Sequence, residues 1–153
     1  MGNRAALTLG LALAFAAGAC IWDSALAQND RLLATVENPA VVTATAGLPE
    51  GFLGQSPRVI VSVTGYEPPR EGGVEVVVKA QSAGSPNEQE IGRFGVFPQS
   101  AFKAPDPSKA KRFGLPLPKE LAASKSLTLR VYLVPFKGSG EGALLELGGA
   151  EIR

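Results

Sequence analysis

The segment from Leu127 to Val134 alternates between apolar and polar side chains, and this pattern constrains the fold more than any other feature of the chain. One face of an extended segment would carry Leu127, Leu129, Val131 and Leu133, and the other Thr128, Arg130 and Tyr132. A period of two residues is typical of a β-strand that buries one face.

Other short segments of this kind are separated by turns rich in Gly, Pro and Asn, which favours a chain of consecutive strands. We expect strands at Leu32–Val36, Val41–Ala46, Arg58–Thr64, Val74–Lys79, Ile91–Phe97, Phe113–Pro118, Leu127–Val134 and Leu144–Arg153. Residues 98–111 read as a long loop, and residues 119–124 as the only helix. The sequence therefore predicts an all-β fold, an antiparallel β-sandwich of about seven short strands with one short helix.

The first 27 residues have the pattern of a signal peptide. Met1–Arg4 is a positively charged start, and Ala5–Ala19 is apolar but shorter than the roughly 20 residues of a membrane-spanning helix. Ala25-Leu26-Ala27 then supplies a small-x-small cleavage pattern. We expect residues 1–27 to be a signal peptide, 28–56 N-terminal strands and a linker, and 57–153 the sandwich, with a periplasmic or secreted location.

Cys20 offers a second route of export. It follows Ala17-Gly18-Ala19, which resembles a bacterial lipoprotein box. Lipidation of Cys20 would anchor the protein to a membrane, and without it we expect no membrane contact. The preferred interpretation is a cysteine within an ordinary signal peptide.

Removal of the signal peptide leaves a chain without Cys, His, Met or Trp. Nucleophilic catalysis by Ser-His-Asp or Cys-His needs one of these residues, as do the usual zinc and copper sites. The whole chain has a formal net charge of +1, which gives no general attraction to nucleic acid. We therefore expect no enzyme activity, no cofactor and no metal site.

Several charged residues are interpreted as ordinary surface charges without a functional role. Glu88 and Glu90 read as solvated loop charges, and Lys109–Arg112 as the basic rim of a loop. Asp106 lacks the cluster of oxygen ligands that calcium requires.

Two aromatic residues are the candidate partner-binding residues. Phe102 lies in a loop that is otherwise polar and flanked by prolines, and Phe97 lies at the start of the same loop. Phe102 fits two interpretations: a satellite core residue beneath the loop, or a protruding anchor for a partner, since aromatic side chains dominate interface energetics.

The order of segments from Pro57 to Arg153 resembles the C-terminal β-sandwich domain of the tyrosinase, polyphenol oxidase and hemocyanin-like group of type-3 copper proteins. The matching pieces are Val59–Gly65, Pro68-Pro69, Gly72-Gly73-Val74, Ile91–Phe97, Phe113–Leu117 with Leu121, Leu127–Pro135 and Leu145–Arg153. In that family a separate helical domain holds two coppers through six histidines. No residue of this chain takes such a role, since the chain has no histidine.

The resemblance implies an exported, non-catalytic accessory domain. The sandwich domain of that family covers the copper domain, in some members with a bulky side chain that mimics the substrate, and Phe102 is the candidate for such a residue here. We expect a type-3 copper oxidase polypeptide as the partner. The oligomeric state stays open.

Two other functions are compatible with the residues. The first is a stand-alone structural or adhesive domain of the cell envelope, because fold does not imply function. The second is a carbohydrate enzyme that uses two carboxylates facing one cleft.

Overall fold

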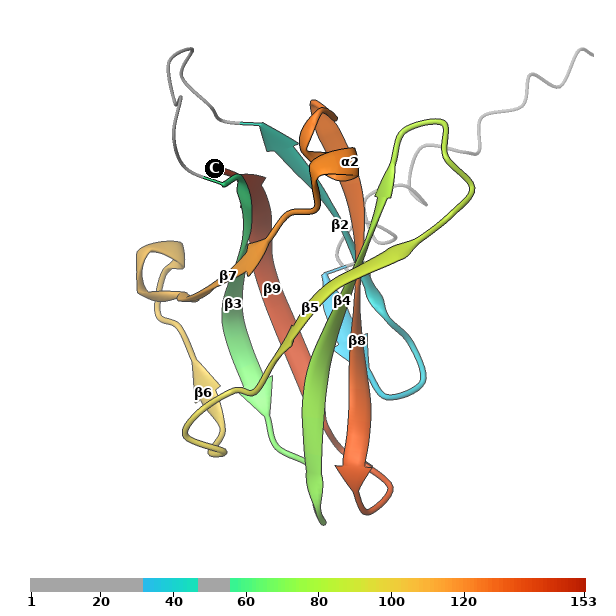
Figure 1. Ribbon diagram of the computed structural model, residues 1–153. Helices are drawn as coiled ribbons and strands as arrows, with labels where there is room; N and C mark the ends of the chain where they lie inside the picture. The colour runs from blue at the N-terminus through green and yellow to red at the C-terminus, as the bar shows by residue number, and fades with distance from the viewer. Residues whose placement is uncertain (1–31, 47–55) are drawn as a thin grey trace, which may run out of the picture.

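A computed structural model of the chain describes residues 32–46 and 56–153, which are mostly β (Figure 1). The strands are β1 (Leu33–Thr35), β2 (Ala40–Ala46), β3 (Arg58–Glu67), β4 (Gly73–Ser82), β5 (Gln89–Phe94), β6 (Phe102–Lys103), β7 (Lys111–Pro116), β8 (Ser126–Lys137) and β9 (Leu144–Ile152). One 3-10 turn, η1 (Pro107–Lys109), and one turn of helix, α2 (Lys119–Ala122), complete the described elements. The all-β class is confirmed. The expected signal peptide and Cys20 lie outside the described residues.

The alternation in β8 builds the core as the sequence predicts. Leu127, Leu129 and Val131 are fully buried, and Leu133 is 2 % exposed. Alternate residues of β3 and β9 join them, among them Val59, Val61, Leu145 and Leu147. Among the described residues no charged or polar side chain is buried, so this core is held by apolar contact.

The expectation of a purely antiparallel sheet is wrong, because β2 pairs in parallel with β9. Ala44–Ala46 run beside Ala150–Ile152 in the same direction, although β1 is antiparallel to β9. A turn at residues 36–39 reverses the chain between β1 and β2, with Thr35 N donating to Asn38 O at 2.8 Å. This reversal sets β2 parallel to β9 while β2 pairs antiparallel with β8.

The two separate sheets of a sandwich are not confirmed. Because β2 bonds to both β8 and β9, the nine described strands form one sheet in the order β5-β4-β8-β2-β9-β3-β6, with β1 also paired to β9 and β7 to β3. Figure 1 shows β3, β7 and β9 on one side of the molecule, with β4, β5 and β8 across from them. The described strands exceed the expected number of about seven, and the strand that the sequence did not predict is the two-residue β6, which lies within the expected loop.

The sheet curls until its two edges, β5 and β7, meet through side chains. The rings of Phe94 on β5 and Phe113 on β7 stack with their centroids 4.0 Å apart. A Cβ at Gly92 would lie 2.9 Å from the side chain of Leu115, so glycine permits the close approach of the two edges. As expected from its prolines, β7 lies at an edge.

The loop expected at residues 98–111 contains β6 and η1. The helix expected at residues 119–124 is confirmed as α2, which buries Leu121. Asp106 caps η1, with its Oδ1 accepting a hydrogen bond from Ser108 N at 2.9 Å.

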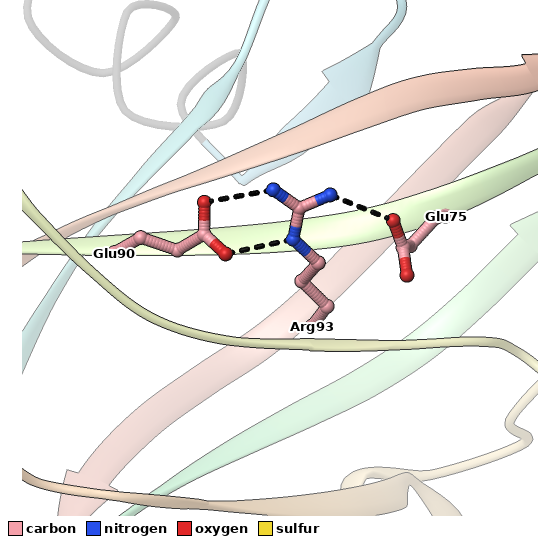
Figure 2. A network of polar contacts seen from close by, with 3 residues as sticks. All are labelled: Glu75, Glu90 and Arg93. Atoms are coloured by element: carbon pink, nitrogen blue, oxygen red, sulfur yellow. Dashed lines mark hydrogen bonds and ion pairs between the residues drawn. The ribbon is translucent and has the colours of Figure 1, made fainter.

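The outward face of β4 and β5 carries a network centred on Arg93 (Figure 2). Its Nε donates to Glu90 at 2.7 Å, its Nη2 to the other oxygen of Glu90 at 3.1 Å, and its Nη1 to Glu75 at 3.1 Å. The hydrogen bond from Arg93 lowers the pKa of the Glu90 carboxyl, and the two carboxylates raise the pKa of Arg93. Because these groups are exposed, the network orders the surface more than it stabilises the fold.

We predict that Arg93→Gln raises the pKa of Glu90 toward its ordinary value of 4.5. A carboxyl whose pKa is lowered by folding contributes stability above its unfolded pKa and loses that contribution as the pH falls through its folded pKa. The stability difference between variant and wild type should therefore disappear at acid pH. Carboxyl NMR titration and denaturant unfolding measure the two effects.

The control is Arg70→Gln, which removes a more exposed arginine that pairs with Glu141 at 2.9 Å. It should leave the pKa of Glu90 unchanged. A Glu90 pKa that stays low in Arg93→Gln would show that Arg93 is not its cause.

Candidate partner-binding site

A pocket of about 700 Å³ lies where β1, β3, β6 and β9 run side by side. Its lining is apolar with a few charges: Leu32, Leu33, Gly65, Tyr66, Glu67, Ala101, Phe102, Lys103, Leu144, Glu146 and Leu147. A concave site with apolar walls and few polar groups is the common form of a binding pocket.

The register of the strands shows which of these side chains point outward. Leu33 pairs with Glu146, Glu146 with Gly65, and Gly65 with Lys103. Directly paired residues share a face of the sheet, so these four form one row. The next row contains fully buried core residues and consists of Ala34, Leu145, Tyr66 and Phe102. The first row therefore faces away from the core. We call Leu33, Gly65, Glu67, Lys103, Leu144 and Glu146 the pocket face.

Gly65 lies in the middle of the pocket face, and the carboxylate of Glu146 lies over it. A Cβ at this position would lie 2.9 Å from Glu146 Oε2, so any larger residue would push Glu146 aside. Glu146 is paired with Lys103 at 3.1 Å on the other side of Gly65. The glycine thus leaves the space that the Glu146 side chain occupies when it pairs with Lys103.

The structure places Phe102 in the inward row, half-buried and packed against the core. This is the position expected of a satellite core residue, and the ring serves as a wall of the pocket. Phe97 lies differently, with 72 % of its side chain exposed. It is therefore Phe97 that presents an aromatic ring to solvent.

Lys111 joins the two aromatic residues, and the sequence did not indicate this role. Its Nζ donates to the backbone oxygen of Phe97 at 2.7 Å and lies 4.2 Å from the centre of the Phe102 ring. A cation over an aromatic face is attracted by the ring. Sequence reasoning placed Lys111 on a loop rim, but it begins β7, on the face that also carries Phe113 and Leu115. That even spacing is the signal that could have identified it.

A second exposed apolar patch was also missed. Val134 and Phe136, at the end of β8, are 40 % and 65 % exposed. They follow Tyr132 at a spacing of two residues and therefore share the outward face of β8.

Glu88 and Glu90, which the sequence suggests are solvated loop charges, are engaged in ion pairs. Glu90 pairs with Arg93 at 2.7 Å, and Glu88 contacts Arg130 with only 22 % of its side chain exposed. Two other carboxylates, Glu67 and Glu146, both line the pocket, so the carbohydrate-enzyme alternative stays a prediction.

The described ranges hold no group of three or more His, Cys, Asp or Glu side chains placed to bind a metal ion. Within the same ranges no helix is long and apolar enough to cross a membrane.

We predict that Lys111→Ala loosens the loop between Phe97 and Pro107, because the variant loses both the hydrogen bond to Phe97 and the contact with Phe102. Backbone amides of residues 97–103 should exchange with deuterium about ten-fold faster or more, the effect of losing roughly 1.4 kcal/mol of local stability. Lys109→Ala, in the 3-10 turn η1 that follows this loop and outside these contacts, should exchange like wild type. Equal protection in both variants would contradict the role given to Lys111.

Comparison with protein-family models, curated proteins and solved structures gives no match for this chain. The resemblance to the C-terminal domain of type-3 copper proteins accordingly stays a prediction from the sequence.

Proposed function

We propose that this chain is an exported, non-catalytic accessory domain that binds a partner polypeptide through the pocket face and Phe97. The observation that supports the proposal most is the pocket itself, a concavity lined by the pocket face together with apolar side chains that belong to the core or pack against it, among them Leu32, Phe102 and Leu147. An exposed aromatic ring on the same loop as β6 adds a second contact.

The energetics favour burial of these groups by a partner. Removing a phenylalanine side chain from water is worth about 1.5–3 kcal/mol, and most of the Phe97 ring is available for this. Lys111 holds the Phe97 backbone at 2.7 Å, so less conformational entropy is lost when the ring is covered.

The alternative of a stand-alone envelope domain expects an evenly polar surface around residues 97–107. The exposure of Phe97 is against that expectation. The outward face of β4 and β5 fits it better, because its charges are paired with each other, as around Arg93.

Export and partner identity rest on the sequence. The pattern of residues 1–27 supports export, and the resemblance of residues 57–153 supports a type-3 copper oxidase polypeptide as the partner. Both are proposals. Recovery of the exported protein together with the polypeptide that it binds tests them in one experiment.

We predict that the tagged protein, exported in its native host and recovered at low salt, brings down a partner polypeptide identified by mass spectrometry. Phe97→Ala should lower the affinity for that partner about ten-fold or more, because loss of an aromatic anchor costs about 1.4 kcal/mol or above. Phe97 is the better test than Phe102, whose truncation would also disturb the core.

Phe136→Ala is the matched control, since it removes a ring of similar exposure from β8. It should leave the affinity within two-fold of wild type. Recovery of the domain alone at native expression would favour the envelope alternative, and a His-rich copper protein in the bound fraction would support the expected partner class.

A further inference from the structure

We infer that the partner inserts an arginine side chain into the pocket, with its stem against Leu144 and its guanidinium on Glu67. This inference rests on the proposed function and specifies the chemistry of the segment that is bound. It follows from the charges of the pocket face and from the position of Leu144 beside Glu67.

The pocket face contains three charged residues, and two of them neutralise each other. Lys103 and Glu146 form an ion pair at 3.1 Å across Gly65. Glu67 is exposed and forms no ion pair with any of the described residues. The pocket face therefore carries one uncompensated negative charge, which favours a cation and disfavours an anion.

The apolar part of the pocket lies directly beside that charge. Leu144 is the cross-strand partner of Glu67 and is half-buried. Side chains paired in this way have their Cβ atoms about 5 Å apart. A group that satisfies both residues must be apolar along its length and positively charged at its end.

Arginine and lysine have this form, and the site favours arginine. Both carry an aliphatic stem that lies along apolar surface while the charged end stays near water. The planar guanidinium also donates two parallel hydrogen bonds to one carboxylate and is more weakly hydrated than an ammonium group. Glu67 offers such a carboxylate, with both oxygens free of hydrogen bonds to the described residues.

The experiment uses the exported protein, grown with 15N, and three synthetic peptides as probes. They are acetyl-Gly-Leu-Arg-Leu-Gly-amide, its citrulline variant, which has the same shape without the charge, and its glutamate variant. Titrations followed by amide shifts should show the arginine peptide perturbing Leu33, Gly65, Glu67 and Leu144. Its affinity should exceed that of the citrulline peptide by about two- to five-fold, the usual effect of an exposed ion pair.

Substitutions of Glu67 make the test specific. Glu67→Gln should remove the difference between the arginine and citrulline peptides, and Glu67→Lys should transfer the preference to the glutamate peptide. Glu71→Gln, at an exposed turn position outside the pocket, should leave the arginine preference intact.

Equal affinities for the arginine and citrulline peptides, or perturbations confined to residues outside the pocket face, would overturn this inference. The proposed function is decided separately. One outcome is a partner that is recovered with the wild type and whose affinity is lowered by Phe97→Ala but unchanged by Glu67→Gln. That result would support the accessory function and contradict the arginine contact.

Discussion

Burial of alternate aliphatic side chains is the constraint on which the rest of this structure depends. The described residues bury no charged or polar side chain, so β3, β8 and β9 must each point the same alternate residues inward for the core to form. The same alternation determines which residues face outward. Because Leu145 and Tyr66 point into the core, Glu146, Gly65 and Lys103 must point away from it. The pocket is thus a consequence of how the core is packed.

Two local features make that outward row a candidate site. Gly65 removes a side chain from the middle of the row, and the pair of Lys103 and Glu146 stands over the space. Lys111 then fixes the neighbouring loop by holding the backbone of Phe97 and covering the ring of Phe102. Gly65 and the ion pair shape the concavity, and Lys111 holds the loop that leads into β6 and carries the exposed ring of Phe97.

The sequence predicted the elements whose signals are local. The strict alternation of Leu127–Leu133 predicted both β8 and its buried face, and residues 119–122 form the expected helix. The parallel pairing of β2 with β9 could not be predicted, since it depends on a reversal at residues 36–39 and on a partner more than a hundred residues away.

The site was predictable only in part, for the same reason. Phe97 and Phe102 were recognised as aromatic residues in a polar loop; Phe102 lines the pocket, and Phe97 is exposed on the loop that leads into β6. The pocket face brings together residues 33, 65, 103 and 146, which become neighbours only through the pairing of four strands. Periodicity within one segment reveals which face a residue occupies, but it carries no information about which strand lies beside it.

The most direct test of the account replaces single residues by a photo-crosslinking phenylalanine analogue in the native host. The analogue at position 97 or 33 should link the protein to the same polypeptide after irradiation, because both positions border the proposed interface. At position 136, on the exposed end of β8, it should give no such product. Crosslinks from position 136 to a polypeptide that positions 97 and 33 never reach would show that the protein binds through a different face, and would contradict the account.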